Sequence, residues 1–269
     1  MTQATLIVST YNRPDALTLC LESILHQNIL PSEVIIGDDG STEETRKVIN
    51  RYQKKFPVPL IHVWQEDKGF RLAKARNKCL AKASYEYIIQ IDGDLILHRD
   101  FVKDHLAFAQ KGFYIKGGRV NITQRLTQKL CQRGRYFHPN IFTPGLTRRE
   151  NSLHMPAIAR YLAPRRKTKP SLGCNMSYWK EDAVLANGYD EFFVGWGGED
   201  FDFAMRLFHL GRKKLALKFA GIVFHLWHND VHMENREKNF DYYDAQVDKK
   251  VTRCEQGLDQ YLNAGGQES

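Results

Sequence analysis

The sequence predicts an α/β fold in which helices flank a mostly parallel central sheet. Strand-like and helix-like segments alternate from residue 5 to residue 91 of the 269-residue chain. The strand-like segments are continuous apolar runs, as in parallel sheets that are buried on both faces. Two of these runs end directly in carboxylates, at Asp38-Asp39 and at Asp92-Gly93-Asp94. Open α/β sheets bind their ligands at this carboxyl edge.

Each element of this first half has a local signal. Pro14 lies near the start of the first helical segment, and Ser41 or Thr42 can cap the second, which Pro57 and Pro59 end. The expected strands cover residues 5–9, 33–37, 60–64 and 87–91, and the expected helices cover residues 15–27, 43–55 and 72–83.

The alternation breaks after residue 100. We expect a helix at 101–110, a strand pair or turn at 112–120, a strand at 172–178, a helix at 199–210, a strand at 215–226 and one or two charged helices at 234–262. Residues 121–169 are polar, basic and interrupted by four prolines. A stretch of this length without predicted elements is typical of a functional lid or a partly disordered segment.

The net charge of +8 is unevenly distributed. Residues 111–170, called the basic segment below, hold 14 Lys or Arg and one acidic residue, Glu150, which gives +13 and leaves −5 for the rest. Such an excess favours a polyanionic partner: phosphates, an acidic glycan or an anionic membrane surface. The alternative is a solvated basic loop. We expect no nucleic-acid partner.

Cysteine usage and hydropathy favour a cytoplasmic protein, with a peripheral position on the inner membrane face as an option. The five cysteines are scattered and contain no CxxC pair, as is typical of reduced thiols. No apolar stretch approaches the ~20 residues of a membrane span. The N-terminus lacks a basic region followed by a long apolar run, so we expect no signal peptide.

The Asp92-Gly93-Asp94 motif is a candidate metal site. Carboxylates that follow a buried strand are exposed at its end, and Gly93 allows a ligand to approach closely. One aspartate holding Mn²⁺ or Mg²⁺, with substrate phosphates completing the shell, is typical of hard-ion sites. His225 and His228 lie three residues apart after a later strand, and either could complete this site. A β-turn and core histidines are the alternatives.

The motif Gly195-Trp196-Gly197-Gly198-Glu199-Asp200 is a candidate acceptor site. Trp196 offers a flat face to a sugar ring. Glu199 and Asp200 begin a helix, whose dipole favours their ionised forms. An ionised carboxylate beside a bound acceptor can remove a hydroxyl proton. The alternative is that both acids only complement the dipole.

Residues after the first two strands, and cations before the third helix, are suited to a nucleotide. Tyr11 can stack on a base, and Asp39 can accept a hydrogen bond from a base or ribose. Lys68, Arg71 and Arg76 can bind a pyrophosphate at the helix N-terminus, unless they are only solvated surface charges. The first strand is not followed by Gly-x-Gly-x-x-Gly or by a Walker A motif.

In this order the motifs resemble those of known glycosyltransferases. Over residues 5–110, the patterns at 8–14, 38–41, 75–77 and 92–94 are similar to family 2 glycosyltransferases of the GT-A fold. The motifs at 195–200 and 225–228 resemble the C-terminal region of β-1,4-galactosyltransferases and chondroitin-polymerase-type enzymes.

The resemblance implies one Rossmann-like GT-A domain over residues 1–269. A nucleotide-sugar-binding half (1–110) would precede an acceptor-binding half (111–233) with a basic lid (121–169), and a C-terminal helical segment (234–269) would follow.

The resemblance also implies residue roles. Asp94 would ligate the metal with His228, and His225 would occupy a neighbouring ligand position that can be Met in galactosyltransferases, so which histidine binds stays open. Glu199 would hold the acceptor, and Asp200 would be the catalytic base. The nucleotide sugar would contact Thr10, Tyr11, Asn12, Arg13, Asp39, Lys68, Arg71, Arg76, Asp92, Gly93 and Trp196.

The implied reaction is an inverting transfer that depends on Mn²⁺ or Mg²⁺. A sugar of the Gal, GalNAc, Glc or GlcNAc type would move from a UDP-sugar to a hydroxyl of an anionic glycan, in bacterial-type surface polysaccharide or lipopolysaccharide biosynthesis. One alternative is a sugar-nucleotide nucleotidyltransferase, which normally needs a Gly-rich basic loop after the first strand. Another is a non-catalytic polyanion-binding protein.

Overall fold

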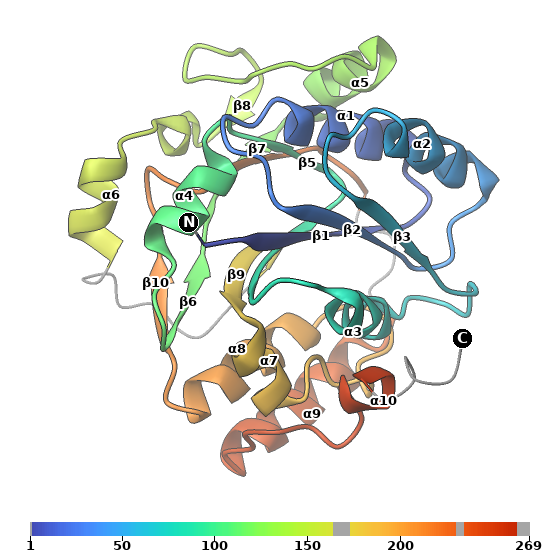
Figure 1. Cartoon of the computed structure of the whole chain (residues 1–269), viewed down its shortest axis with the longest axis vertical. Helices are drawn as coiled ribbons and strands as arrows, with labels where there is room; N and C mark the ends of the chain where they lie inside the picture. Colours follow the sequence, from blue (N-terminus) through green and yellow to red (C-terminus); the bar gives the residue numbers. More distant parts are fainter. Residues whose placement is uncertain (1, 164–172, 230–233, 263–269) are drawn as a thin grey trace.

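The computed structural model describes residues 2–163, 173–229 and 234–262. A seven-stranded sheet with the order β10-β6-β9-β4-β1-β2-β3 runs through the molecule (Figure 1). Its strands are β1 (Ala4–Thr10), β2 (Glu33–Asp38), β3 (Leu60–Trp64), β4 (Tyr87–Asp92), β6 (Phe113–Lys116), β9 (Asn175–Trp179) and β10 (Lys213–Ala216). β9 alone is antiparallel to its two neighbours, β4 and β6. The predicted mostly parallel α/β sheet is therefore confirmed.

Helices cover both faces of this sheet, as Figure 1 shows. Along β1, Leu6 and Val8 pack towards α1, α2 and α4, whereas Ile7 packs towards α3, α7 and α8. These helices are α1 (Pro14–Leu25), α2 (Glu43–Gln53), α4 (Phe101–Phe108), α3 (Leu72–Lys82), α7 (Lys180–Ala186) and α8 (Glu199–His209). Fully burying such a side chain contributes about 1.5–3 kcal/mol. Two covered faces explain why the strand sequences are continuously apolar.

A second sheet brings the histidine motif to the acidic motif. It has the order β5-β11-β7-β8, with β5 (Leu95–Leu97), β11 (Ile222–His225), β7 (Gly118–Ile122) and β8 (Leu146–Thr147). β5 follows β4 after a two-residue turn and pairs antiparallel with β11. This register places His225 opposite Leu95, and the Leu226 amide donates to the Asp94 carbonyl at 3.0 Å.

The single strand predicted at 215–226 is wrong. The segment divides into β10, which belongs to the large sheet, and β11, which belongs to the small one. Between them the backbone turns at Phe219 (φ 69°) and Gly221 (φ 56°). The Gly221 amide donates to the buried Asp104 carboxylate at 2.8 Å, which holds this turn.

The prediction of a long loop at 121–169 is also wrong for residues 121–163, the part of this stretch that the structure describes. This stretch forms α5 (Gln124–Arg133), β8, the 3₁₀ helix η1 (Arg149–Ser152) and α6 (Pro156–Leu162). Leu130 and Ala159 are buried in two core clusters. Pro156 begins α6 because proline fits the first helical turn. The last residues of the predicted lid, including Arg165 and Arg166, lie outside the described residues.

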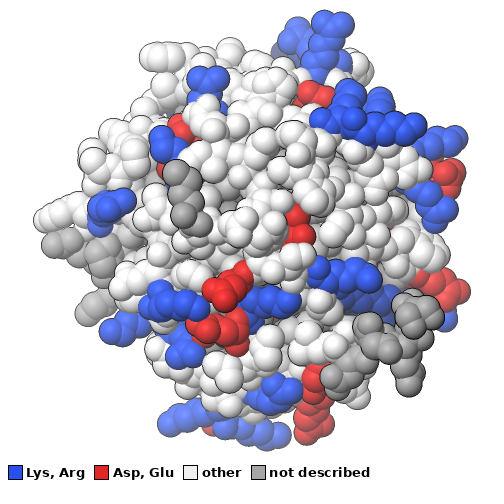
Figure 2. Space-filling view, in the orientation of Figure 1, with Lys and Arg blue, Asp and Glu red and all other residues white. Residues whose placement is uncertain are grey.

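The terminal segment forms two helices, which is one of the two arrangements predicted for residues 234–262. α9 (Arg236–Asp248) packs on α8, and α10 (Asp259–Leu262) packs on α3. All five cysteines are free thiols and four are buried, which fits the predicted reduced state. Among the described helices, none is both long and apolar enough to cross a membrane. On the face in Figure 2, basic side chains form separate groups rather than one patch.

Candidate active site

Asp94 lies in the two-residue turn between β4 and β5. The Gly93 amide donates to the Ser9 carbonyl of β1 at 2.7 Å. A Cβ atom at Gly93 would lie 3.0 Å from that same oxygen. The close approach of two backbones explains a glycine between the two aspartates.

Asp94, His225, His228 and Arg13 form what we call the Asp94 cluster. The Asp94 Oδ2 atom lies 3.6 Å from His225 Nε2 and 3.4 Å from His228 Nε2. Arg13 Nη1 lies 3.2 Å from the same oxygen. The other oxygen, Oδ1, is buried and has no hydrogen-bond partner among the described residues. The structure therefore brings together all three predicted metal ligands.

The Asp94 cluster fits a divalent cation. The candidate ligand atoms of Asp94, His225 and His228 lie within 4.8 Å of one another. Burial lowers the pKa of His225, which keeps its imidazole in the neutral, metal-binding form. One carboxylate and two imidazoles suit Mn²⁺ and similar ions, and the unpartnered Oδ1 atom is a further free acceptor.

A second group, the Arg76 cluster, consists of Arg76 with Asp92, Glu199 and Asp200. The Arg76 side chain is 1% exposed. Its Nη1 atom lies 2.7 Å from Asp200 Oδ1 and 3.4 Å from Glu199 Oε1, and its Nη2 atom lies 3.2 Å from Asp92 Oδ1. The guanidinium also stacks over the Tyr189 ring, at 5.0 Å. One buried cation thus joins α3, β4 and the start of α8.

Burial changes the proton affinities in the Arg76 cluster. Desolvation raises the pKa of Asp92 to about 6, although Arg76 opposes the shift. It also raises the pKa of Glu199, and the neighbouring Asp200 carboxylate adds to that shift. The expectation that the helix dipole favours an ionised Glu199 is wrong on balance, because desolvation outweighs it.

At the ends of β1 and β2, Asp39 is buried and hydrogen-bonded. It accepts from Gln65 Nε2 at 2.5 Å and from the Arg71 amide at 2.7 Å. Desolvation raises its pKa. Tyr11 is 42% exposed, and its hydroxyl donates to Asp67 at 3.0 Å.

The remaining predicted contacts surround these groups. The Asn12 side chain accepts from the Thr42 amide at 2.9 Å, and Thr10 is buried at the end of β1. Lys68 pairs with the exposed Glu66 at 2.8 Å, and Trp196 is 38% exposed. Among the described contacts, neither Lys68 nor Trp196 touches a member of the two clusters. Their roles in binding the nucleotide sugar, like those of the other predicted residues, stay predictions.

Sequence reasoning missed two residues of this region. Gln65 directly follows β3 and bonds Asp39, and its position after a strand could have indicated it. Tyr189 supports Arg76 from a buried position, and its hydroxyl oxygen accepts a hydrogen bond from Gln90 Nε2 at 2.8 Å. Nothing local in the sequence marks Tyr189, because its partners come from β4 and α3.

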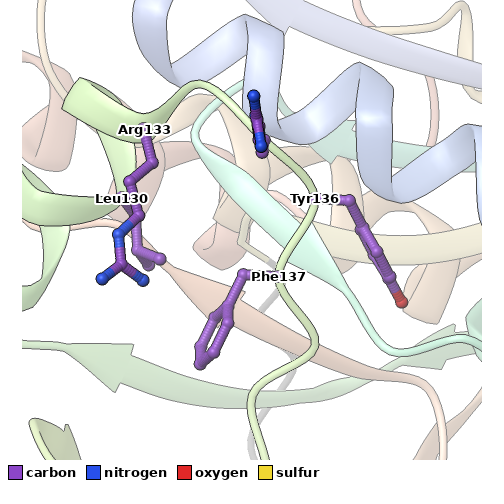
Figure 3. Close-up of a pocket in the computed structure, with 5 residues that line it drawn as sticks. Leu130, Arg133, Tyr136 and Phe137 are labelled. Carbon is purple, nitrogen blue, oxygen red and sulfur yellow. The ribbon is translucent and has the colours of Figure 1, made fainter.

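A separate hollow of about 500 Å³ lies in the basic segment (Figure 3). It is lined by Leu130, Arg133, Arg135, Tyr136 and Phe137. In Figure 3, the Arg133 and Phe137 side chains point in the same direction from α5 and the turn after it. No member of the Asp94 or Arg76 cluster lines this hollow.

Two family profiles match the chain. The family described as "Glycosyl transferase family 2" matches residues 5–167, and the one described as "N-terminal domain of galactosyltransferase" matches residues 153–229. The two matches meet inside the basic segment. Together they span both clusters.

Three curated relatives illustrate the sequence similarity. A hyaluronan synthase of Pasteurella multocida is 28% identical over 222 residues, which cover 77% of this chain and 23% of the synthase. A chondroitin synthase of Escherichia coli is 26% identical, over 77% of this chain and 32% of that protein. A validoxylamine A glucosyltransferase of Streptomyces hygroscopicus subsp. limoneus is 28% identical, over 75% of this chain and 47% of that enzyme. The chain thus spans less than a third of the two synthases.

Solved structures confirm the GT-A type of α/β fold. The S. aureus TarS 1–349 complex with UDP-GlcNAc superposes with a TM-score of 0.63 at 18% identity, over 98% of this chain and 71% of TarS. Mannosyltransferase PcManGT from Pyrobaculum calidifontis, in complex with GDP-Man and Mn²⁺, also superposes with a TM-score of 0.63. The identity is 17%, over 92% of this chain and 64% of PcManGT. At such identities the likeness concerns the fold alone.

Proposed function

This chain belongs to glycosyl transferase family 2, and we propose that it transfers a sugar from a UDP-sugar to a hydroxyl group of a glycan. The observation that carries the proposal is the meeting of two clusters at the end of β4. The Asp94 cluster offers cation ligands, and the adjacent Arg76 cluster offers a positioned carboxylate. Family membership argues against the nucleotidyltransferase and the non-catalytic alternatives.

We propose that the chain works as one domain. Residues 1–110 would bind the nucleotide sugar and residues 111–233 the acceptor, and in the C-terminal segment α9 would support α8. One observation supports this division: Asp39 follows β2 and Asp92 ends β4, whereas Asp200 lies in α8.

On the donor side, Asp39 would accept a hydrogen bond from the uracil, and Tyr11 would stack on it, with Thr10 and Asn12 lining the pocket. TarS, a protein of the same fold, has been solved with UDP and with UDP-GlcNAc. Arg13 is 29% exposed and lies against Asp94. A cation on Asp94 would replace that contact and leave the Arg13 guanidinium free for the donor diphosphate.

Asp94 and His228, with His225 beside them, would hold Mn²⁺ or Mg²⁺. When bound, the ion would stabilise the charge of the departing diphosphate. The buried, unpartnered Asp94 Oδ1 atom, described above, supports this assignment. Two proteins of similar fold, PcManGT and GalNAc-T7, have been solved with Mn²⁺.

On the acceptor side, Asp200 would take the hydroxyl proton while the acceptor oxygen attacks the anomeric carbon. Attack from the face opposite the diphosphate inverts that carbon. Arg76 orients the Asp200 carboxylate through its 2.7 Å contact. Glu199 would bind the acceptor hydroxyls, and Trp196 would stack on a sugar ring.

The basic segment would contact an anionic acceptor, such as a surface polysaccharide or a phosphorylated lipopolysaccharide core. Its +13 charge supports this acceptor class. The same charge would also suit an anionic membrane surface. A cytoplasmic protein at the inner membrane face therefore stays a prediction. Arg148 directly precedes η1 and Arg149 begins it, and both side chains are exposed. Charge reversal of Arg148, Arg149, Arg165 and Arg166 together should raise the acceptor KM several-fold and leave donor hydrolysis unchanged. Unaltered acceptor kinetics would reject the anionic acceptor.

The first experiment is UDP release from a panel of UDP-sugars, without acceptor, in Mn²⁺, Mg²⁺ or EDTA. Slow hydrolysis of one sugar that EDTA abolishes would support the class and identify the donor. If no sugar is hydrolysed and UDP fails to bind with Mn²⁺ by calorimetry, the UDP-sugar donor is rejected.

A further inference from the structure

A second group of metal-type side chains lies at the opposite end of β5 from Asp94. It consists of His98, Asp100 and His154, whose candidate ligand atoms lie within 4.8 Å of one another. His98 directly follows β5, Asp100 precedes α4, and His154 lies between η1 and α6. The group therefore joins the core to the basic segment. It shares no residue with the Asp94 or Arg76 cluster.

The hydrogen bonds of His154 determine where its lone pair points. Its Nε2 atom lies 3.1 Å and 3.0 Å from the two carboxylate oxygens of Asp104. Since a carboxylate only accepts, Nε2 carries the proton. In the neutral ring, Nδ1 then carries the lone pair, and it faces Asp100 Oδ2 at 3.9 Å. Two acceptor atoms thus face each other.

A cation bound between His154 Nδ1 and Asp100 Oδ2 would give both acceptor atoms a partner. Metal-binding histidines typically donate their other ring nitrogen to an outer carboxylate, which is the relation of His154 to Asp104. Asp104 is itself fixed by the Gly221 amide, and Asp100 Oδ1 is held by Asn28 at 2.9 Å. On a tetrahedral ion with bonds of about 2.0–2.1 Å, ligand atoms lie about 3.3 Å apart. The His154 Nδ1 and Asp100 Oδ2 atoms, 3.9 Å apart, must therefore approach by about 0.6 Å.

His98 is the third candidate ligand and is available in neutral form. It is 7% exposed, and burial beside His154 and His138 lowers its pKa to about 4. Its ring lies 4.4 Å from the His154 ring and 5.0 Å from the His138 ring. The His98 Nδ1 atom accepts the Asp100 amide at 3.2 Å, so a metal would have to displace that hydrogen bond.

We propose that His98, Asp100 and His154 form a second divalent-cation site, of the kind that takes Zn²⁺, which fastens the basic segment to the core. Two imidazoles and one carboxylate favour a borderline ion over Mg²⁺. The fourth position is open to water or to His138. A bound ion would link β5 and α4 to the residues before α6.

The test uses Co²⁺, a coloured substitute for Zn²⁺, on the full chain. An Asp94→Ala, His228→Ala background disables the proposed active-site ion. We expect this protein to bind one equivalent of Co²⁺ with the visible absorption of an imidazole-ligated ion. Adding His154→Gln should remove that equivalent, whereas adding His26→Gln, an exposed histidine outside the group, should not.

Other results would overturn the proposal. If the background protein binds no Co²⁺, the group holds no divalent cation and the proposal fails. If Co²⁺ binding persists after His154→Gln, the ion sits elsewhere. If His154→Gln fails to fold, Asp100→Asn replaces it. Zn²⁺ should also raise the Tm of the background protein, and an unchanged Tm contradicts the fastening role. Neither readout depends on transferase activity.

Discussion

Two clusters of ionisable side chains meet at the end of β4, and their carboxylates are partnered in different ways. In the Arg76 cluster, a cation that is 1% exposed contacts three carboxylates. In the Asp94 cluster, the only arginine is 29% exposed, and one carboxylate oxygen has no hydrogen-bond partner within the described part of the chain. Each cluster includes an aspartate at the end of β4: Asp92 is its last residue, and Asp94 lies two residues later.

We call the Arg76 cluster complete because a buried cation contacts each of its carboxylates, and the Asp94 cluster incomplete because one carboxylate oxygen keeps no partner among the described residues. Buried charges cost free energy unless they are paired, and in the Arg76 cluster one guanidinium contacts all three carboxylates, although Arg76 Nε itself has no hydrogen-bond partner among the described residues. The Asp94 cluster leaves an acceptor that a ligand can use. We therefore expect changes in the first to affect the fold and the position of Asp200, and changes in the second to affect ligand binding.

Asp94→Ala should have the largest effect, because it removes the central ligand of the incomplete cluster. We expect loss of Mn²⁺-dependent UDP-sugar binding and a transfer rate lower by ~10³ or more, as several kcal/mol of transition-state stabilisation disappear. Calorimetry and turnover measure the two effects. Asp241→Ala, on the exposed side of α9, is the matched control. Normal Mn²⁺-dependent binding in Asp94→Ala would refute the assignment.

Asp200→Asn keeps the shape of the Arg76 cluster and removes the proposed base. We expect transfer to fall by ~10²–10⁴, the usual contribution of a general base, with UDP binding retained. Steady-state rates and UDP calorimetry separate these outcomes. Near-normal turnover would mean that Glu199 or another group is the base.

Arg76→Met tests the complete cluster through stability. It leaves three carboxylates without their buried cation, and breaking buried ion pairs typically costs ~3–5 kcal/mol. Chemical denaturation of the variant should show a loss of this order. The control, Arg46→Met, breaks an exposed pair with Glu43 and should change stability by less than about 1 kcal/mol. Equal effects of the two substitutions would show that Arg76 does not hold the cluster.

Glu199→Gln should have the smallest effect, on the pH profile. Desolvation and Asp200 raise the pKa of Glu199, so in the wild type it loses its proton at a higher pH than an ordinary glutamate. If the ionised form binds acceptor hydroxyls, kcat/KM for the acceptor should rise as pH passes that value. The variant should lack this rise. A wild-type-like profile would assign the titration to another group.

The same shift has a consequence for stability with a definite sign. A carboxyl group whose folded pKa is raised stabilises the fold most at pH below its unfolded pKa, and the contribution is lost as pH rises through the folded value. Wild-type stability should therefore fall more between acidic and neutral pH than that of Glu199→Gln. Equal pH dependence of the two proteins would contradict the raised pKa.

Much of the N-terminal half could be predicted from local signals, and much of the basic segment could not. Strands β1 to β4 and helices α1 to α3 have their own apolar runs, prolines and caps, and all appear within a few residues of their expected positions. In the basic segment, α5 and α6 are short and mostly exposed, and the few apolar side chains that anchor them, such as Leu130 and Ala159, are buried against distant elements. A local pattern cannot reveal such packing.

By itself, the sequence determined the strand-helix alternation, the carboxylates at the strand ends and the two C-terminal motifs. These are properties of neighbouring residues, set by apolar periodicity and by turn chemistry. Only the tertiary structure decided that Arg76 contacts Asp200, 124 positions away, and that His225 reaches Asp94 through the pairing of β11 with β5. It also decided that burial, and not the helix dipole, dominates at Glu199. Ion pairing and desolvation depend on which distant groups exclude water, and that information exists only once the chain has folded.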